Sequence, residues 1–411
     1  MTKAKADELR INGKSYFITQ DDRKKCMICD SDSSIVIFLY DHKYWNQLEE
    51  VRSAYVCGSF TGWIELSDFC MKNSPSLSLH YLAVPFEKLR ETGNSGHPEY
   101  KFCINGLYVS LAGKDFILSP YVFPSFDKNL MVIFNGENLE EIEKQNLLAG
   151  TVKSLADFDL SSRSGQEEIS NFRLVPGTKK LFRSFHPFYS TGGRCSIFET
   201  EKKRIEIAQK LAVEAEIKSD INLTDDYTLF AGNEINWYDG TCSKVEIPQF
   251  YQRIIDSKSV CNVKSASGIT PSYEYVYMNP RNPLFSEWMR LIVEFIIDDA
   301  HEAPFMIHCA IGTDRTGVFS AILGAVCGAD WNEVSCDYEK TNRLGILEFR
   351  SRTMLAKSFQ RLLGVEDVSK IKSLKAALWK YFTSETFEGE PILTKNQLEK
   401  LSKKLGGRDS L

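Results

Sequence analysis

The sequence predicts two domains of different fold class, an N-terminal all-β sandwich and a C-terminal α/β domain with a helical extension. The chain of 411 residues is longer than one hydrophobic core usually supports. Between Ser34 and Phe134 short strand-like segments alternate with turns, whereas beyond residue 170 strand and helix patterns alternate. These observations place the domains at 1–150 and 170–385, with a linker at 151–169 and a helical tail at 386–411.

Five segments of the N-terminal part are rich in β-branched and aromatic residues. Clusters of Gly, Asn and Pro separate them, as expected for antiparallel strands joined by turns. The segments are IVIFLY (35–40), AYVCGSF (54–60), LHYLAVP (79–85), EYKFCING (99–106) and LMVIF (130–134). Their length and spacing predict a small β-sandwich.

Polar sequence separates the two domains. The stretch SLADFDLSSRSGQEEIS (154–170) has no clean period, which favours a linker. After it, Thr200–Glu214 carries apolar residues at helical spacing, and Leu284–Ile297 carries a broader apolar stripe. Both segments are therefore expected to be helices of the α/β domain.

The loop HCAIGTDRTG (308–317) follows the short apolar strand FMI and precedes the apolar helix VFSAILGAVCG. A loop at the carboxyl end of a strand is where α/β sheets bind ligands. Further on, Asp330 and Glu333 have the spacing of a capping box that opens another helix. Thr394 and Gln397 open a basic amphipathic helix (393–405), which we expect to be solvated and packed on the domain.

The composition bears on location and partners. A formal net charge of −5 offers no general attraction to nucleic acid or anionic lipid, so a polyanionic substrate must be captured locally. The charged N-terminus lacks the apolar segment of a secretory signal, and no apolar run reaches the roughly 18 residues of a membrane span. The 11 cysteines have no disulfide-framework spacing, which fits a reducing compartment. We expect a cytoplasmic protein without a membrane span or a nucleic-acid partner; the sequence carries no sign of an oligomeric state.

The residue types of the loop favour a bound phosphate. Gly312 and Gly317 allow turns in which successive N–H groups point inward. A helix that begins near Thr316 adds its positive dipole end, and Arg315 offers a planar fork of donors. The expected phosphate-binding residues are Ala310, Ile311, Gly312, Thr313, Arg315 and Gly317.

Cys309 lies at the start of this anion-binding loop. The same donors favour the thiolate, which makes Cys309 a nucleophile near neutral pH. Attack on phosphorus would give a phosphocysteine that water hydrolyses, with no metal or cofactor required because Arg315 and the amides stabilise the charge. His308 could orient the loop through its backbone, and Thr316 could donate to the sulfur as it leaves.

The pattern H-C-x5-R-T-G resembles the signature of the Cys-based protein tyrosine phosphatase superfamily. SNFRLVPGTKKLFRS (170–184) is similar to the strand pair that opens the catalytic domain in the branch with H-C-x-x-G-K-D-R-T-G loops. DYEKTN (337–342) is similar to the D-Y-x-x-[ST]-N motif of the same branch. The resemblance implies the fold of that superfamily and a phosphatase activity.

The chain departs from the branch at several positions. Thr313 replaces a Lys that relatives associate with phosphoinositide substrates, which puts that activity in doubt. In the opening motif Pro176-Gly177 replaces Gly-Gly, and Leu174 replaces Asp. The residues alone suggest no interpretation of the second change.

The proton donor for the leaving group is not obvious from the sequence. The superfamily usually supplies it from a loop upstream of the Cys, but YMNPRNPLFSEW (277–288) contains no Asp. In the branch with the Asp-Arg pair this Asp is the acid, so the resemblance implies Asp314, whose protonated form a nearby thiolate and phosphate would favour. The alternatives are that Asp314 only buttresses Arg315 or caps the helix, with Asp239 as the next acid to consider.

CGSFTGW (57–63) and PEYKFCINGLY (98–108) resemble the early-set sandwich modules that bind glycogen or starch. In those modules two aromatic rings stack on glucose and a Lys binds hydroxyls. The matching positions here are Trp63, Tyr108 and Lys101, with Tyr in place of a second Trp. The alternative is a sandwich of the same kind in which Trp63 merely packs.

The expected function is that of a Cys-dependent phosphomonoesterase acting on phosphotyrosine or dual-specificity protein substrates. A glucan phosphatase is an alternative, because some phosphatases join a carbohydrate module to such a core. Inositol polyphosphates are another alternative, for which a basic rim would be formed by Lys179, Lys180, Arg183 and Arg194. A more remote alternative is an inactive binding module, against which the intact Cys309 and Arg315 argue.

Overall fold

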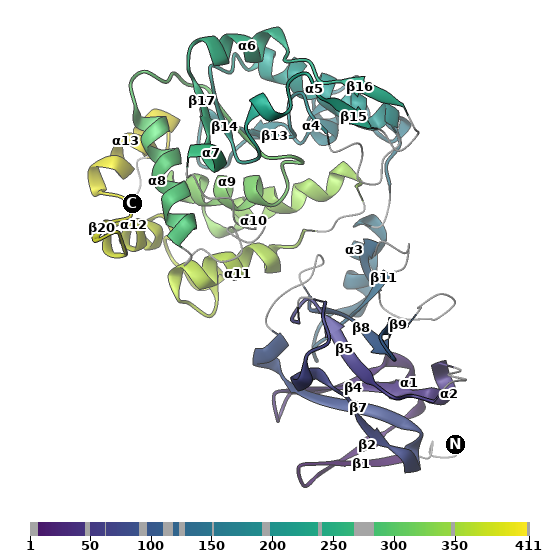
Figure 1. Cartoon of the computed structure of the whole chain (residues 1–411). Helices are drawn as coiled ribbons and strands as arrows, with labels where there is room; N and C mark the ends of the chain where they lie inside the picture. Colours follow the sequence, from purple (N-terminus) through teal and green to yellow (C-terminus); the bar gives the residue numbers. More distant parts are fainter. Residues whose placement is uncertain are drawn as a thin grey trace. The chain divides into compact units, whose positions relative to one another are not determined.

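The computed structural model describes residues 7–45, 50–61, 63–89, 97–109, 118–122, 128–149, 152–190, 198–236, 241–266, 283–346 and 350–408. The chain forms two compact units, Met1–Thr151 with Leu347–Phe349, and Val152–Ile346 with Arg350–Leu411. The first unit is rich in strands, and the second places helices around a central sheet (Figure 1). The predicted layout of two domains is thereby confirmed.

The N-terminal unit contains the predicted β-sandwich. One sheet has the order β3-β4-β7-β6 and the other the order β10-β11-β8-β5, with β9 paired to β8. Aromatic rings join their inner faces: Phe38 lies 4.7 Å from Tyr100, and Tyr40 lies 5.3 Å from Phe102, between ring centroids. The strands are β3 (Met27–Asp30), β4 (Ile35–Asp41), β5 (Ala54–Gly58), β6 (Lys72–Ser74), β7 (Leu79–Pro85), β8 (Glu99–Ile104), β9 (Leu107–Tyr108), β10 (Leu118–Val122) and β11 (Lys128–Met131).

A hairpin that was not predicted covers the outer face of the first sheet. Its strands, β1 (Asp7–Ile11) and β2 (Lys14–Ile18), bury Leu9 and Ile18 against Ile37 and Leu39 of β4. Because β4 is buried on both faces, its residues read as a continuous apolar run instead of alternating. Three helices complete this unit: α1 (Gln20–Lys25), α2 (His42–Trp45) and α3 (Leu139–Ala149).

The C-terminal unit is built on a five-stranded sheet of order β12-β13-β18-β14-β17. The edge strand β12 (Arg173–Leu174) is antiparallel to β13 (Leu181–Ser184). The other strands are parallel: β13, β18 (Phe305–His308), β14 (Ser219–Asn222) and β17 (Val260–Asn262). Strand β18 therefore lies in the middle, and the loop that follows it opens at the carboxyl edge of the sheet.

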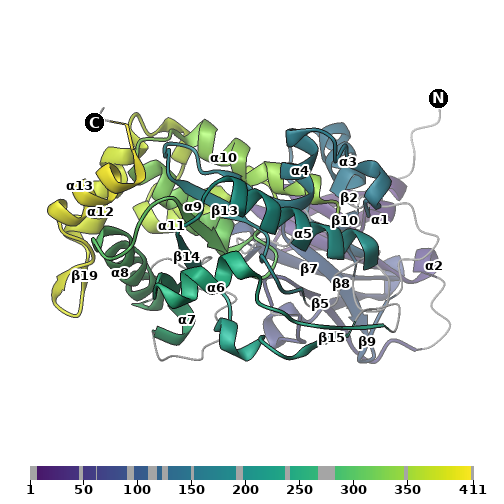
Figure 2. The ribbon, with the colours of Figure 1, turned by 90° about the horizontal axis from the view of Figure 1, so that it is seen from above.

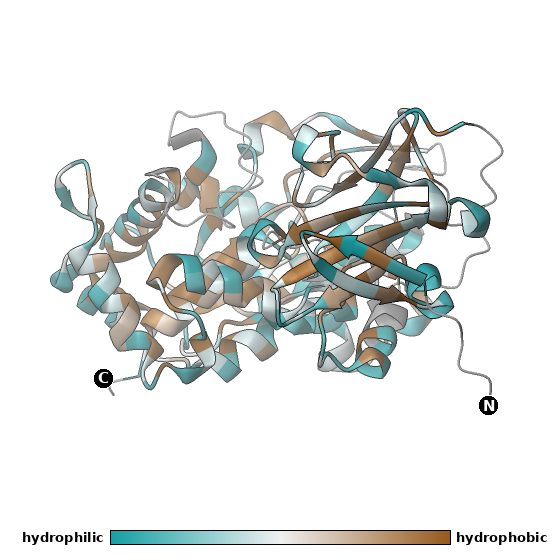
Figure 3. Ribbon diagram, turned by 90° about the horizontal axis from the view of Figure 1, so that it is seen from below, coloured by the Kyte–Doolittle hydropathy of each residue, from teal (hydrophilic) through white to brown (hydrophobic). Residues whose placement is uncertain are grey.

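Helices cover both faces of this sheet. Ile221 and Ile307 face a large apolar core formed with α8 (Pro283–Ile297), α9 (Arg315–Val326), α10 (Trp331–Glu339), α11 (Arg352–Leu363), α12 (Leu374–Ser384) and α13 (Lys395–Leu405). Met306 faces a second core formed with α4 (Arg163–Ser170), α5 (Phe198–Glu214) and α6 (Gln249–Asp256). Figure 2 shows α4 and α5 running side by side. Hydrophobic residues, brown in Figure 3, run along strands and along the packed sides of helices.

The remaining elements are short: α7 (Val263–Ala266), the hairpin of β15 (Glu234–Asn236) and β16 (Cys242–Lys244), and the hairpin of β19 (Thr386–Phe387) and β20 (Glu390–Pro391). Both predicted capping boxes are confirmed, at Asp330 with Glu333 and at Thr394 with Gln397. Among the described residues no helix is both long enough and apolar enough to cross a membrane.

Two predicted boundaries need correction. The segment 151–169 is not a free linker, because α4 begins there and Ile169 is fully buried in the second unit. The segment 386–411 is not a separate tail, since α13 packs on α8 with Leu398, Leu401 and Leu405 fully buried. Both segments are polar overall, but each forms a helix whose apolar residues recur at helical spacing and bury one narrow face.

Candidate active site

The loop between β18 and α9 turns sharply at Gly312. This residue has a φ of +78°, and a Cβ there would lie 2.2 Å from the carbonyl oxygen of Ser184. Glycine is thus required for both the conformation and the contact. The turn directs the Gly312 N–H to the sulfur of Cys309, at 3.3 Å.

Further amides of the loop are available to an anion. Within the described part of the chain the N–H groups of Ala310, Ile311 and Thr313 donate to no protein acceptor. Helix α9 begins at Arg315, so its positive dipole end adjoins the same loop. These features agree with the anion-binding loop that the sequence predicts, and phosphate binding itself stays a prediction.

Gly317 has a different role from the predicted one. It lies inside α9, and its N–H donates to the carbonyl of Thr313 at 3.1 Å, so it offers no amide to a phosphate. A Cβ at this position would lie 2.5 Å from the ring of Tyr338. Gly317 is therefore needed for the close approach of α9 and α10.

Cys309 is buried, with 3% of its surface exposed. Burial opposes ionisation, but the charge of Arg315 and the hydroxyl and N–H of Thr316 outweigh it, so the pKa of Cys309 is lowered below the ordinary thiol value. The thiolate is the reactive form of cysteine. The lowered pKa favours this form at Cys309, and the role of Cys309 as a nucleophile stays a prediction.

Arg315 is anchored beside this sulfur. Its Nη1 donates to the carbonyl of Leu223, just after β14, at 2.7 Å. Among the groups that lower the pKa of Cys309, the positive charge of Arg315 has the largest effect. The Thr316 hydroxyl is buried, and no partner among the described residues meets it with good hydrogen-bond geometry. It is therefore available to the Cys309 sulfur, whose pKa it lowers.

Asp314 is held by an arginine that the sequence did not indicate. Both carboxylate oxygens accept from Arg350, whose Nη2 lies 2.9 Å from Oδ2. Arg350 is itself fixed through its backbone, since Asn342 accepts from its N–H at 2.7 Å and donates to its carbonyl at 2.8 Å. The Asp314 side chain does not cap α9. Pairing with a guanidinium favours the carboxylate, the opposite of the form that a proton donor needs.

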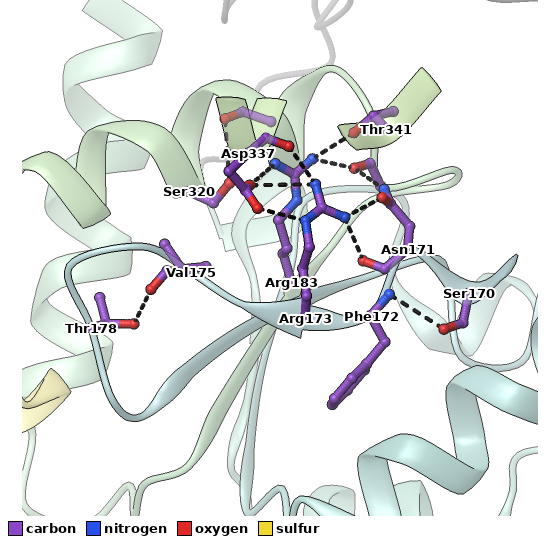
Figure 4. A network of polar contacts seen from close by, with 12 residues as sticks. Ser170, Asn171, Phe172, Arg173, Val175, Thr178, Arg183, Ser320, Asp337 and Thr341 are labelled. Carbon is purple, nitrogen blue, oxygen red and sulfur yellow. Dashed lines mark hydrogen bonds and ion pairs between the residues drawn. The ribbon is translucent and has the colours of Figure 1, made fainter. Parts of the chain in front are cut away.

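A buried network of hydrogen bonds and ion pairs supports the loop (Figure 4). The carbonyl of Gly312 accepts from Asn171 at 2.9 Å and from Arg183 at 2.8 Å. Arg183 and Arg173 both contact Asp337 of α10, at 2.8 and 2.6 Å. The segments 170–184 and 337–342, which resemble the superfamily, thus contact each other through these arginines, and the first of them binds Gly312.

The sequence suggested no functional role for Asp337 and assigned Arg183 to an outer basic rim. Arg183 is instead 1% exposed and bound to the loop. Lys179 lies by the end of α13, where its N–H donates to Leu405. Arg194 lies outside the described residues. Since Arg183 faces inward, the proposed rim is not formed as predicted.

Other carboxylates of the second unit that could be considered as the acid are Asp239, Asp298 and Glu287. Asp239 lies outside the described residues, as do residues 277–282 of the upstream stretch. Asp298 is exposed and accepts from the N–H of Ala300. Glu287 lies on α8, and burial, followed by the charge of Glu388, raises its pKa. Asp314 remains the carboxylate within the loop itself.

In the N-terminal unit two of the three predicted glycan-contacting residues lie together. The Tyr108 hydroxyl donates to the carbonyl of Trp63 at 2.6 Å, and 37% of Tyr108 is exposed. Lys101 differs from the expectation, because it is 1% exposed on the central strand β8 and does not present its ammonium to solvent. A glycan-binding role of these residues stays a prediction.

Comparison with known families agrees with this site. Residues 254–406 match the model of the tyrosine phosphatase family. The match runs from the end of α6 through the loop to the last turn of α13, which again makes the segment after 385 part of the domain. No curated protein matches the chain.

Proposed function

Because the chain belongs, through residues 254–406, to the tyrosine phosphatase family, we propose that it is a Cys-dependent phosphomonoesterase acting on phosphotyrosine or dual-specificity protein substrates. The observation that carries the proposal is Cys309, a buried thiol whose pKa is lowered by Arg315 and Thr316 and whose sulfur accepts from the N–H of Gly312.

The reaction proceeds in two steps at phosphorus. The Cys309 thiolate forms a bond to phosphorus while the bond to the substrate oxygen breaks, and that oxygen takes a proton from Asp314. Arg315 and the loop amides bind the phosphoryl oxygens as charge develops. Water then attacks the phosphocysteine, Asp314 accepts its proton, and inorganic phosphate and the thiolate are released. No step requires a metal ion.

The ion pair between Asp314 and Arg350 sets a condition on the acid step. Asp314 must take up a proton before it can give one, and Arg350 disfavours this. A bound phosphate dianion brings negative charge to the same loop, which attracts the guanidinium and favours protonation of the neighbouring carboxylate. Binding of the substrate thus prepares the acid, and Arg350 supplies a cation near the position where relatives have the Lys replaced by Thr313.

A substrate panel tests the proposal. Purified protein should release phosphate from phosphotyrosine peptides and para-nitrophenyl phosphate, and Cys309→Ser should abolish release while still binding vanadate. Cys336→Ser is the matched control, because this thiol lies on α10 of the same unit and contacts Asn332 and Arg352 instead of the loop residues. Turnover that survives in Cys309→Ser would overturn the mechanism.

A glucan phosphatase is the second candidate, favoured by the adjacent Trp63 and Tyr108. Aromatic platforms bind sugar rings by stacking, and a sandwich that carries one could hold the catalytic unit near a phosphorylated glucan. Phosphate release from phosphorylated amylopectin should then exceed release from free glucose 6-phosphate. Inert amylopectin beside an active phosphotyrosine peptide would eliminate this candidate.

A further inference from the structure

Three polar side chains are buried next to the loop, between the central sheet and α6. Asp220 comes from β14, His308 from the end of β18 and Tyr251 from α6, and none is exposed to solvent. The Tyr251 hydroxyl donates to Asp220 Oδ2 at 2.6 Å, and His308 Nε2 lies 3.1 Å from the same oxygen. The proposed reaction gives Asp220 and Tyr251 no part.

The contact of Nδ1, the other ring nitrogen of His308, determines the position of one proton. Nδ1 lies 3.2 Å from the carbonyl oxygen of Cys309. A carbonyl can only accept, so Nδ1 must carry hydrogen. His308 thereby holds the peptide group from which the loop starts.

Two arrangements of the remaining proton fit the distances. Either His308 is doubly protonated and Asp220 is a carboxylate, or Asp220 is a neutral acid that donates to Nε2. A carboxyl group is a stronger acid than an imidazolium, and the hydrogen bond that Asp220 accepts from Tyr251 further stabilises its charged form, so the proton is favoured on Nε2. Burial alone would lower the pKa of His308, but Asp220 outweighs it and the pKa is raised. The ion pair is the favoured arrangement.

A second histidine in contact with His308 adds no competing charge. The rings of His186 and His308 lie 4.7 Å apart at 76°. His186 Nδ1 accepts from the N–H of Tyr189 at 3.0 Å and so carries no proton, and burial holds the pKa of His186 well below its usual range. The other titratable groups around the cluster are Asp226, Tyr227, Cys261, Cys309 and Arg315.

We propose that Asp220 and Tyr251 are positioning residues that hold His308 as a doubly protonated imidazolium directly below the nucleophile. This fixed cation pins the Cys309 carbonyl and adds to Arg315 in favouring the thiolate. The consequence for catalysis rests on the proposed function of Cys309, whereas the protonation state does not.

Nitrogen NMR of the full chain labelled with ¹⁵N-histidine tests the protonation state directly. The chain has 6 histidines, and His308→Asn identifies the signal of interest. At pH 7 both nitrogens of His308 should appear at imidazolium positions, while His186 should appear as the neutral tautomer protonated on Nε2. A neutral His308 protonated only on Nδ1 would overturn the proposal.

Asp220→Asn tests the consequence. The amide keeps the shape of the carboxylate but carries no charge, so a buried imidazolium would lose its counterion and the neutral form of His308, protonated on Nδ1, is favoured. Loss of a cation near Cys309 disfavours its thiolate. The rate at which iodoacetamide alkylates Cys309 should therefore rise at a higher pH, with a midpoint shifted upward by roughly half to one pH unit. Mass spectrometry of the peptide that contains Cys309 measures this rate. The acidic limb of kcat/KM should move in the same direction.

Glu201→Gln is the matched control, since it also removes a buried carboxylate from an ion pair of this unit, with Arg204. It should leave the midpoint unchanged, and Tyr251→Phe should shift it less than Asp220→Asn. A midpoint that stays fixed in a folded Asp220→Asn protein with neutral His308 would refute the effect on Cys309. If the wild-type protein hydrolyses no phosphomonoester, the proposed function fails, yet the NMR and alkylation results still decide this inference.

Discussion

Two opposing requirements act on the protonation state of Asp314. As a proton donor it must be neutral, but its pairing with Arg350 favours the charged form. In the proposed mechanism phosphate binding would resolve this conflict, because it would bring negative charge to the loop. Asp314 is thus expected to be a carboxylate in the free enzyme and an acid only with substrate bound.

Replacing Asp314 by Asn removes the proton donor but keeps the size of the side chain. We expect vanadate binding to be retained and turnover of phenyl phosphate, which has a poor leaving group, to fall by about 10²- to 10⁴-fold. Turnover of para-nitrophenyl phosphate should fall far less, because its leaving group needs no proton. Steady-state kinetics on both substrates measure the difference.

The control for this variant is Asp298→Asn, the same change at an exposed position, which should alter neither rate. Equal losses on both substrates in Asp314→Asn would indicate that Asp314 only orders the loop with Arg350. The search for an acid would then return to Asp239.

At the scale of elements, the loop depends on segments distant in sequence. Gly312 is bound by Asn171, which precedes β12, and by Arg183 of β13, and α10 supplies the carboxylate of Asp337 that holds two arginines. The charges are buried, so their pairing matters more than in solvent. The loop geometry is therefore a property of three elements together.

Replacing Asp337 by Asn leaves Arg173 and Arg183 without their carboxylate. We expect the free energy of unfolding at pH 7 to fall by about 3 to 5 kcal/mol, the cost of breaking a buried ion pair. Although burial opposes ionisation, the two arginines lower the pKa of Asp337. This contribution is present above the ordinary carboxyl pKa and is lost as the pH falls through the lowered value.

Urea unfolding of the wild type and the variant gives this difference. The matched control is Asp256→Asn at the exposed end of α6, which should change the free energy of unfolding by less than about 0.5 kcal/mol. A loss below about 1 kcal/mol in Asp337→Asn would mean that the arginines find other partners.

Elements with a strong local pattern could be predicted from the sequence. The long helices α5 and α8, both capping boxes and the strand before the loop lie where expected. The hairpin β1–β2 was missed, because its few apolar residues become informative only when β4 is known to be buried on both faces. Helix α4 was missed because its polar composition hides a narrow buried face.

The site could be predicted only in part, because some of its residues come from segments that are distant in the sequence. Cys309 and Arg315 belong to one short motif with fixed spacing, whereas Arg350 and Asp220 reach the loop from distant segments. No local period marks a partner that far away. Gly317 was assigned to the phosphate because a motif does not distinguish a glycine needed for a turn from one needed for helix packing.

At the scale of the whole molecule, the two units carry separable chemistry. The nucleophile and every residue bound to its loop in the described structure belong to the second unit. Trp63 and Tyr108 belong to the first. A defect in one unit should therefore leave the intrinsic activity of the other intact.

Replacing Trp63 by Ala tests this separation. If the first unit binds glucan, the variant should lose most retention on insoluble amylopectin, by about tenfold or more for a stacking platform, and keep wild-type turnover of para-nitrophenyl phosphate. Co-sedimentation measures retention. Phe17→Ala is the matched control, because Phe17 is an aromatic side chain 65% exposed on β2 of the same unit. Retention that is equal in all three proteins would remove the glycan hypothesis.

The position of β18 limits how this molecule can be divided. Its two neighbours, β13 and β14, both precede residue 254, where the match to the family begins. A fragment cut to the matched region would leave the strand that carries His308 with unpaired edges on both sides, and would also lose Asn171, Arg183 and Asp220. For expression, the shortest coherent phosphatase thus begins near Val152, about a hundred residues before the recognisable family sequence.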